Sequence, residues 1–272
     1  MKTKRTKIIA DLTSNHLGDM EVIEAMIHCL SEHKIDFIKI QSWRADMLRK
    51  DYPDYQSNYN YYEKHQLSDD DHYRVLELCK KYEIQFLTTC FNINRIDFLS
   101  SLGINTIKVA SSDFGSYRMI SKLLDKFESL IISAGASTKE ELEKTIDLCK
   151  GRDVTFLHCV STYPCPLNEV NMERMLYLRE RGLKVGYSDH TLGTEASKYA
   201  ICLGAKYVEK HFTLNRYLPG RDQKMSSTID EMSELLEWSH LVNSMRGSEE
   251  PELSASQLTF RKNYIAKWGN NQ

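Results

Sequence analysis

The sequence predicts an α/β fold in which eight parallel strands alternate with eight helices, the (β/α)8 or TIM barrel. Short runs rich in β-branched residues alternate with longer segments of helical period, and this alternation repeats eight times along the 272 residues. The short runs are almost continuously apolar, as parallel strands are when helices cover both faces of a sheet. Eight such units need about 250 residues, which the chain supplies.

The predicted elements alternate along the whole chain. Strands are expected at Lys7–Asp11, Asp36–Gln41, Gln85–Thr89, Thr106–Ala110, Ser129–Ser133, Val154–His158, Lys184–Tyr187 and Tyr207–Lys210. Helices are expected at Asp19–His33, Ser68–Tyr82, Asn92–Leu102, Tyr117–Phe127, Thr138–Lys150, Glu169–Arg181, Thr194–Leu203 and Ile229–Met245. Ser68 and Thr138 are favourable N-caps followed by acidic residues, and Gly103, Gly151 and Gly204 follow the ends of predicted helices.

An open, doubly wound sheet is the alternative fold. The first predicted strand is not followed by a G-x-G-x-x-G sequence, so that fold lacks the local signature of dinucleotide binding. The Tyr-rich connection 42–66 lies outside the eight units, and its length is typical of a lid or a binding loop. We expect a barrel domain over residues 1–246 and a tail or linker over residues 247–272.

The composition favours a cytoplasmic protein with no nucleic-acid or membrane partner. The chain carries 36 Lys and Arg against 38 Asp and Glu, and the net charge of -2 disfavours a globally basic nucleic-acid binder. No apolar run approaches a membrane helix, and Asp11 interrupts the short apolar stretch after the basic N-terminus, so we expect no secretory signal. Seven cysteines without small-scaffold spacing indicate a reducing compartment.

Polar residues gather at the carboxyl ends of the predicted strands, where barrels of this class place their chemistry. Lys39 and Lys108 lie within apolar strands, and two ammonium groups converging inside a barrel need an anion, because an unpaired buried charge is costly. Hydroxyl groups at neighbouring strand ends suit phosphate or carboxylate oxygens. The pattern favours a small, doubly anionic substrate such as a phosphorylated acid; the alternative is that both lysines extend into solvent.

His190 and His211 end consecutive predicted strands and are therefore expected side by side at the same rim. Two neutral imidazoles with open positions suit Mn, Fe, Co or Zn, and Asp11, Glu209 and Asp113 are available as further ligands or as partners of the ligands. The alternative is one hydrogen-bonded core histidine and one surface histidine.

The turn after the sixth predicted strand is rich in proline. Tyr163 precedes Pro164-Cys165-Pro166, and the sequence leaves open whether this turn is a rigid connector or presents Tyr163 to a substrate hydroxyl. Alternation along the strand points His158 and Cys159 to opposite faces, and we expect Cys159 to pack in the core.

These motifs together give the chain a family resemblance. It resembles the sialic acid synthase (N-acetylneuraminate synthase) family of phosphoenolpyruvate-dependent synthases, collinearly over nearly the whole chain. The matching stretches are Asn15-His16-x-Gly18-Asp19, Ile38-Lys39-Ile40-Gln41, Phe86-Leu87-Thr88-Thr89-x-Phe91, Ile107-Lys108-Val109-Ala110-Ser111, Ile132-Ser133-Ala134-Gly135, Leu157-His158-Cys159-Val160-Ser161-x-Tyr163-Pro164, Gly186-Tyr187-Ser188-Asp189-His190-Thr191-Leu192-Gly193 and Glu209-Lys210-His211-Phe212-Thr213-Leu214-x-Arg216-x-Leu218-Pro219-Gly220-x-Asp222.

The resemblance implies a TIM barrel that condenses phosphoenolpyruvate with an open-chain amino sugar and releases phosphate. It implies that His190 and His211 hold a divalent metal, Mn²⁺ or Mg²⁺, which polarises the sugar aldehyde as a Lewis acid. The residues implied for phosphoenolpyruvate are Lys39, Thr89, Lys108, Ser111, Ser133, Ser161 and Ser188. The residues implied for the sugar are Gln41, Tyr163 and Asp222, and we expect catalytic roles for Asp11, Lys39, Lys108 and Asp113.

Four positions depart from the family pattern. Asp11 and Asp113 stand where the family usually carries glutamate, which shortens the reach of each carboxylate, and Cys90 and Arg221 stand where proline is common. The sequence ends near the position of the linker that precedes an antifreeze-like domain in the family. In family members, that domain places an arginine in the active site of the other subunit. We expect the barrel domain alone, as a homodimer, with Arg221 contacting the sugar in place of that arginine.

Two other functions remain open. One is a synthase for a shorter or phosphorylated aldose, with an octulosonate-type product. The other is a catalytically silent barrel that acts as a binding subunit. The presence of both histidines, both lysines and the hydroxyl groups favours an active enzyme.

Overall fold

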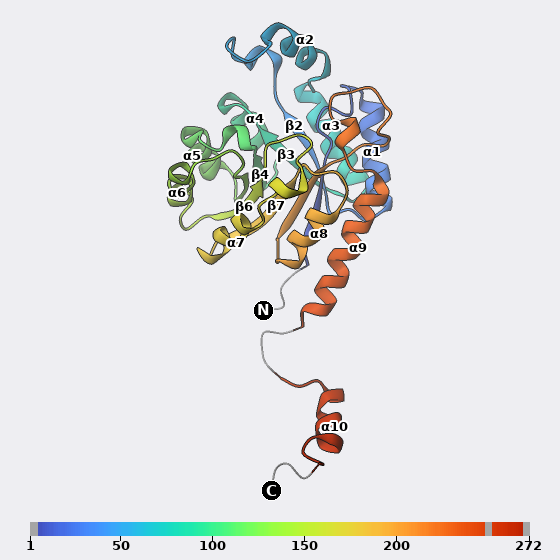
Figure 1. Cartoon of the computed structure of the whole chain (residues 1–272). Coiled ribbons are helices and arrows are strands. Elements are labelled where there is room, and N and C mark those ends of the chain that lie inside the picture. Colours follow the sequence, from blue (N-terminus) through green and yellow to red (C-terminus); the bar gives the residue numbers. More distant parts are fainter. Residues whose placement is uncertain (1–4, 248–251, 269–272) are drawn as a thin grey trace.

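Residues 5–247 and 252–268 are described by a computed structural model of the chain, which forms a closed parallel barrel (Figure 1). The strands pair in chain order, and the last pairs with the first. They are β1 (Lys7–Asp11), β2 (Phe37–Ser42), β3 (Gln85–Cys90), β4 (Thr106–Val109), β5 (Ser129–Ser133), β6 (Asp153–Cys159), β7 (Lys184–Asp189) and β8 (Tyr207–His211). The predicted (β/α)8 fold is confirmed, and the open-sheet alternative is wrong.

Each strand is followed along the chain by a helix on the outside of the barrel (Figure 1). These helices are α1 (Met20–Glu32), α3 (Asp69–Lys81), α4 (Ile96–Ser101), α5 (Tyr117–Lys126), α6 (Lys139–Leu148), α7 (Glu173–Glu180), α8 (Glu195–Cys202) and α9 (Ile229–Arg246). The two predicted N-caps both form capping boxes: Ser68 accepts from the backbone N–H of Asp71, and Thr138 accepts from that of Glu141. Each satisfies an otherwise free donor in the first turn, which is worth about 1 kcal/mol.

The long connection after β2 contains a helix that the sequence did not predict. This helix, α2 (Tyr55–His65), lies beyond the carboxyl ends of the strands, above the barrel in Figure 1. Two predicted helices are shorter than expected. The segment predicted from Asn92 begins with a 3-10 turn over Ile93–Arg95, and the helix predicted from Glu169 begins only at Glu173.

Inward-facing side chains divide the interior of the barrel into an apolar lower layer and a polar upper layer. The lower layer, which we call the plug, is a separate apolar cluster of Ile9, Phe37, Leu87, Ile131, Leu157 and Tyr207. Residues two positions apart on a strand point the same way, so β2 carries Phe37 in the plug and Lys39 directly above it. A second, much larger apolar core fills the space between the strands and the helices.

The C-terminal segment leaves the barrel after α9. A further helix, α10 (Ala255–Tyr264), follows it, and every residue from 252 to 268 is exposed. The sequence predicted this tail without a helix; residues 248–251 and 269–272 of the predicted tail, and residues 1–4 of the basic N-terminus, lie outside the described residues. Within the described ranges, no helix has both the length and the apolar character needed to span a membrane.

Candidate active site

A cavity of about 610 Å³ opens at the carboxyl ends of the strands. Side chains from all eight strands or from the residues directly after them line it. The predicted site residues among them are Asp11, Lys39, Gln41, Thr89, Lys108, Ser111, Ser133, Ser161, Tyr163, Ser188, His190, His211 and Asp222. Asp113 and Arg221 do not line this cavity.

Four buried charged side chains form the floor of the cavity, directly above the plug. Lys39 Nζ lies 2.7 Å from Asp11 Oδ2 and 3.1 Å from Glu209 Oε1. Lys108 Nζ lies 3.7 Å from the same Glu209 oxygen and donates to Ser133 Oγ at 2.6 Å. The alternative that the two lysines extend into solvent is wrong, because both are almost fully buried.

The two lysines differ in how well their charges are compensated. Burial alone would lower the pKa of Lys39, but the contacts with Asp11 and Glu209 outweigh it and raise this pKa. Burial lowers the pKa of Lys108, and Glu209, its only carboxylate contact within 4 Å in the described chain, offsets this only in part. Lys108 is therefore the cation that gains most from an additional anion in the cavity.

The floor also carries unused hydrogen-bonding capacity. Glu209 Oε2 and Thr89 Oγ1 are buried, and neither has a hydrogen-bond partner in residues 5–247 or 252–268. Buried polar atoms are rarely left without partners, so these two atoms indicate that a ligand or water completes the site. Thr89 lies on β3 beside Lys108 of β4, with which it pairs in the sheet.

Serine hydroxyls converge at one side of the cavity because a glycine leaves room for them. A Cβ atom on Gly135 would lie 2.5 Å from Ser161 Oγ and 2.6 Å from Ser111 Oγ, closer than real contacts allow. The backbone N–H of Gly135 donates to Ser111 Oγ at 3.2 Å. Together with Ser133 on Lys108, these groups form a compact set of donors that suits the oxygens of a small anion.

The two predicted imidazoles lie side by side at the rim. The ring centroids of His190 and His211 are 5.4 Å apart, and the ring of Tyr163 lies 4.1 Å and 5.9 Å from them. His190 Nδ1 lies 2.7 Å from the carbonyl oxygen of Val160, so Nδ1 donates this bond, and in the neutral ring the lone pair lies on Nε2. Burial lowers the pKa of His211, which favours the neutral ring there.

These imidazoles fit a divalent metal as a two-ligand site. A backbone carbonyl that orients the ring of a ligand histidine is the usual support for such a ligand. Asp11 and Glu209, considered above as further ligands, are instead bound to Lys39, and the described residues contain no group of three His, Cys, Asp or Glu side chains arranged around one point. The remaining coordination positions would fall to substrate and water oxygens.

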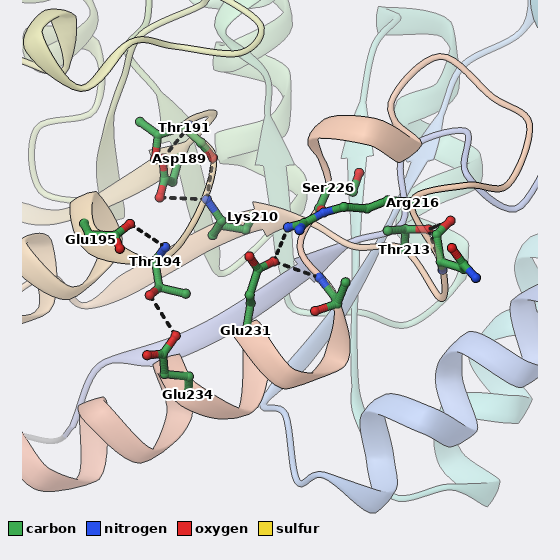
Figure 2. A network of polar contacts seen from close by, with 12 residues as sticks. Asp189, Thr191, Thr194, Glu195, Lys210, Thr213, Arg216, Ser226, Glu231 and Glu234 are labelled. Atoms are coloured by element: carbon green, nitrogen blue, oxygen red, sulfur yellow. Dashed lines mark hydrogen bonds and ion pairs between the residues drawn. The ribbon is translucent and has the colours of Figure 1, made fainter.

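Behind the imidazoles, Asp189 and Lys210 form a fully buried ion pair at 2.9 Å (Figure 2). Strand alternation turns both side chains to the outer face of the barrel wall, away from the cavity. The backbone N–H of Thr191 and the hydroxyl of Ser197 donate to the Asp189 carboxylate, and Lys210 also donates to the carbonyl of Thr191. The pair therefore fixes the two strand ends that carry the imidazoles.

Removing one partner of this ion pair should destabilise the folded protein, whereas replacing both partners with apolar residues should not. We expect Lys210→Met to lower the free energy of unfolding by about 3 kcal/mol, because it leaves the Asp189 charge buried without its counterion. The double variant Asp189→Leu with Lys210→Met should recover most of this loss. Urea denaturation measures both. Lys184→Met, which breaks an exposed pair with Asp153, is the control, and an equal effect there would contradict the expectation.

Asp113 lies beside a neighbouring hollow and not in the charged floor. It accepts hydrogen bonds from Ser112 at 2.8 Å and from Ser116 at 3.3 Å, and burial raises its pKa. Its expected catalytic role stays a prediction.

Arg221 contacts helix α2. Its guanidinium carbon lies 3.7 Å above the ring of Tyr61, and its Nη1 donates to Asn58 Oδ1 at 2.6 Å. The Tyr61 hydroxyl in turn lies 2.7 Å from Ser14 Oγ, in the loop after β1. Arg221 thus connects the loop after β8, which carries Asp222, to the helix above the cavity; the expected contact with a sugar stays a prediction.

Arg221→Ala should loosen α2. A cation–π contact is worth about 0.5 to 2 kcal/mol, so local opening of residues 55–65 should become about 2- to 30-fold more frequent. Amide hydrogen exchange measured by mass spectrometry should show faster exchange in these residues. Arg152→Ala, at an exposed pair with Asp125, serves as the control, and unchanged exchange in 55–65 would show that the Arg221 contact does not hold the helix.

The sequence did not predict three features of the cavity: the central place of Glu209, the exposure of Cys159 to the cavity, and two tyrosines in its lining. Glu209 was considered only beside the histidines, but it contacts both lysines at the centre of the floor. Cys159 was expected in the core, and instead it lines the cavity, with its Sγ 3.7 Å from His190 Nδ1. Tyr52 and Tyr62, from the connection after β2, also line the cavity. Strand alternation above the plug is the signal that could have placed Cys159 and Glu209 there.

Comparison with known proteins gives consistent matches. The chain matches the NeuB family over residues 26–251. N,N'-diacetyllegionaminic acid synthase of Legionella pneumophila is 33% identical, over 93% of this chain and 77% of its own length. The human N-acetylneuraminate-9-phosphate synthase is 28% identical, over 96% and 77% of the two chains. The crystal structure of a sialic acid synthetase from Leptospira borgpetersenii, in complex with citrate, superimposes with a TM-score of 0.90 at 25% identity, over 97% of this chain and 94% of that one.

The matches confirm the resemblance that the strand-end motifs predict. The family match extends over the strands that carry Lys39, Lys108, Glu209 and the imidazole pair, and the relatives are named as synthases of sugar acids. The chain belongs to the NeuB family of sugar acid synthases.

Proposed function

We propose that the chain joins phosphoenolpyruvate to the aldehyde of an N-acylated amino-hexose, forming a 2-keto-3-deoxy sugar acid and releasing phosphate. The observation that carries the proposal is the pair of buried ammonium groups in one cavity, of which Lys108 is only partly compensated. Relatives named as legionaminic, pseudaminic and N-acetylneuraminate-9-phosphate synthases support the class of product.

The floor of the cavity suits phosphoenolpyruvate. Lys108 would bind one anionic group of the substrate, supported by Ser133, and the free hydroxyl of Thr89 would donate to it. Lys39 would stabilise the second anionic group while its contacts with Asp11 and Glu209 hold it in place. Charges fixed before the substrate arrives need no reorganisation during the reaction, which makes them effective in stabilising a transition state.

The proposed reaction forms one carbon–carbon bond and breaks one carbon–oxygen bond. Carbon 3 of phosphoenolpyruvate attacks the aldehyde carbon of the sugar, and water adds to carbon 2, where positive charge develops. The resulting tetrahedral centre loses phosphate by cleavage of the bond between carbon 2 and the bridging oxygen. One proton of the water ends on the new sugar hydroxyl and the other on phosphate.

His190 and His211 would hold a divalent ion, Mn²⁺ or Mg²⁺, which polarises the sugar aldehyde when it is bound. The carbonyl of Val160 keeps the Nε2 atom of His190 available for it. Tyr163 covers both imidazoles, and Gln41 is fixed by donating to Asp11 Oδ2 at 3.0 Å. Gln41, Tyr163 and Asp222 would orient the sugar hydroxyl and acylamino groups at the mouth of the cavity.

Phosphate release tests the proposal directly. The protein, Mn²⁺ and phosphoenolpyruvate are mixed with a panel of aldoses, and the released phosphate is measured. With phosphoenolpyruvate carrying ¹⁸O at the bridging position, the label should appear in phosphate, because the carbon–oxygen bond is the one that breaks. No phosphate release with any sugar would favour the silent-barrel alternative, and release only with a pentose phosphate would favour the octulosonate-type synthase.

The setting of the enzyme is a further part of the proposal. We propose that it works in the cytoplasm as a homodimer of barrels, with no nucleic-acid or membrane partner. All seven cysteines are free, as suits a reducing compartment. Light scattering after size exclusion should give about twice the chain mass of 31.6 kDa, and a mass of one chain would exclude the dimer.

A further inference from the structure

The loop after β8, residues 212–228, connects two parts of the proposed site, and the structure describes all of it. His211 lies directly before the loop and Asp222 lies near its far end, and both side chains line the cavity. The regular structure of the loop is limited to a 3-10 turn over Gln223–Met225 and an isolated bridge. Contacts with neighbouring elements must therefore hold these two side chains at a fixed separation.

One buried side chain, Asn15 in the loop after β1, contacts both ends of the loop after β8. Its Nδ2 donates to the carbonyl oxygen of Phe212, the residue after His211, at 2.8 Å. The same nitrogen donates to Ser226 Oγ, also at 2.8 Å. Asn15 is 2% exposed, so a single amide group, shielded from water, joins the start of the loop to its end.

The first of these contacts fixes the main chain beside His211. The backbone N–H of Phe212 donates to the carbonyl of Asp11 at 2.8 Å, and the backbone N–H of Ser227 donates to the carbonyl of His211, also at 2.8 Å. Asn15 binds the next polar group along the chain, the carbonyl of Phe212. With these three main-chain groups held, the direction in which the His211 side chain leaves the strand is fixed.

The second contact reaches Asp222 through Ser226. Ser226 Oγ accepts from Asn15 and donates to the carbonyl oxygen of Asp222 at 2.7 Å. Gln223, the neighbour of Asp222, donates from Nε2 to the main-chain oxygen of Asn15 at 3.0 Å. Arg216 also binds this turn, by donating to the carbonyl of Ser226 at 2.9 Å (Figure 2). Asn15 therefore holds the turn that begins at Asp222 against the loop after β1.

The loop after β1 has an unfavourable conformation and an unpaired acceptor around Asn15. Thr13 and Leu17 have left-handed backbones, with φ of 46° and 55°, which residues with a Cβ atom adopt uncommonly and β-branched residues rarely. Asn15 Oδ1 is buried and has no hydrogen-bond partner among residues 5–247 and 252–268. Strained residues persist only where the surrounding structure determines them, and they cluster at functional sites. The two bonds that Asn15 donates are the contacts that this conformation makes possible.

We propose that Asn15 is a positioning residue, which sets the separation between His211 at the metal ion and Asp222 at the sugar. This inference rests on the proposed function, because both roles are part of it. Asn15 is not among the residues that line the cavity, so it acts only through the main chain next to these two side chains. Lys108 and Ser133, on β4 and β5, lie outside this set of hydrogen bonds. Binding of phosphoenolpyruvate should therefore depend little on Asn15.

Asn15→Leu is the sharpest variant. Leucine has nearly the same shape as asparagine and donates no hydrogen bond, so both contacts are lost and no charge is added. Loss of an outer partner of a metal ligand costs about 10- to 100-fold in affinity, and we expect the lower end because Asn15 acts on the main chain. Mn²⁺ affinity, followed by electron paramagnetic resonance, should fall about 10-fold and KM for the sugar should rise about 10-fold, while KM for phosphoenolpyruvate stays within about twofold.

A matched control and a contrary outcome complete this experiment. Asn105→Leu makes the same change at an exposed position before β4, at the opposite end of the barrel, and should leave all three quantities unchanged. An equal loss for Mn²⁺, sugar and phosphoenolpyruvate in Asn15→Leu would show that Asn15 only stabilises the fold. A folded Asn15→Leu protein with wild-type Mn²⁺ affinity and sugar KM would overturn the inference.

Ser226→Ala separates the two contacts and decides the question if Asn15→Leu does not fold. It removes the link to the carbonyl of Asp222 and keeps the bond from Asn15 to the carbonyl of Phe212. KM for the sugar should rise about threefold or more, and Mn²⁺ affinity should stay within about twofold of the wild type. Equal changes in the two quantities, or no change in either, would contradict the proposal.

The Mn²⁺ titration also separates this inference from the proposed reaction, because it needs no turnover. If Asn15→Leu weakens Mn²⁺ binding in a chain that releases no phosphate with any sugar, the proposed reaction fails and the effect of Asn15 on His211 stands. If the wild type releases phosphate and Asn15→Leu binds Mn²⁺ and sugar normally, the inference fails and the proposed function stands. A wild-type chain that binds no Mn²⁺ would overturn the part of the inference that concerns His211.

Discussion

Lys108→Met is expected to lower kcat/KM for phosphoenolpyruvate by about 100- to 1,000-fold. Losing one partner of a buried, hydrogen-bonded charge pair costs about 2 to 5 kcal/mol, and each 1.4 kcal/mol is a factor of ten. Lys108 should contribute near the middle of this range, because its pKa is lowered and its carboxylate partner, Glu209 at 3.7 Å, is distant. Initial rates of phosphate release over a range of phosphoenolpyruvate concentrations measure the effect.

The folded barrel should tolerate this change. Glu209 keeps its contact with Lys39, so no buried charge is left alone, and methionine is close in length to the apolar part of the lysine side chain. Lys126→Met, at an exposed pair with Asp97, is the matched control and should keep full activity. A Lys108→Met enzyme that folds normally and keeps its kcat/KM within about threefold would refute the role given to this residue.

Removing the divalent ion should abolish activity, and the imidazole pair should determine how tightly the ion returns. Chelation is expected to stop phosphate release, and Mn²⁺ should restore it. His211→Ala should weaken Mn²⁺ binding by more than about 100-fold, since loss of even an outer partner of a metal ligand costs about 10- to 100-fold. Titration with Mn²⁺ followed by electron paramagnetic resonance measures this affinity without reference to catalysis.

A remote histidine supplies the comparison for this experiment. His240 is exposed on α9, away from the cavity, and His240→Ala should leave Mn²⁺ affinity unchanged. Full activity of the wild-type chain after exhaustive chelation would exclude an essential metal. Equal Mn²⁺ affinities of His211→Ala and the wild type would show that Mn²⁺ does not bind at the imidazole pair.

The barrel could be predicted from the sequence because its signals are local. Parallel strands covered by helices are apolar runs, and caps such as Ser68 and Thr138 begin helices at positions that the structure confirms. Helix α2 was not predicted in this way, because its sequence is rich in Tyr and Asn and contains no aliphatic residue. Its place depends on contacts with distant segments, namely Tyr61 with Ser14 and with Arg221.

Most candidate site residues could be predicted because strand ends meet at one rim in a barrel. That rule identifies which residues share the rim but gives no distances between them. It could not reveal that Glu209 lies between the two lysines, or that Arg221, although next to Asp222, contacts α2 instead of the cavity. Those arrangements depend on side-chain packing that no local pattern encodes.

The plug below the charged floor closes the lower end of the cavity, so that substrates enter only from the carboxyl ends of the strands. Whatever binds beside Lys108 lies at the bottom, and whatever binds beside Tyr163 lies above it. For the proposed reaction, phosphoenolpyruvate must therefore bind before the sugar, because a sugar that bound first would block the path to Lys108. Steady-state kinetics should show a compulsory order of addition, in which excess sugar is a competitive inhibitor with respect to phosphoenolpyruvate. Random addition would show that phosphoenolpyruvate can still reach Lys108 when a sugar is bound.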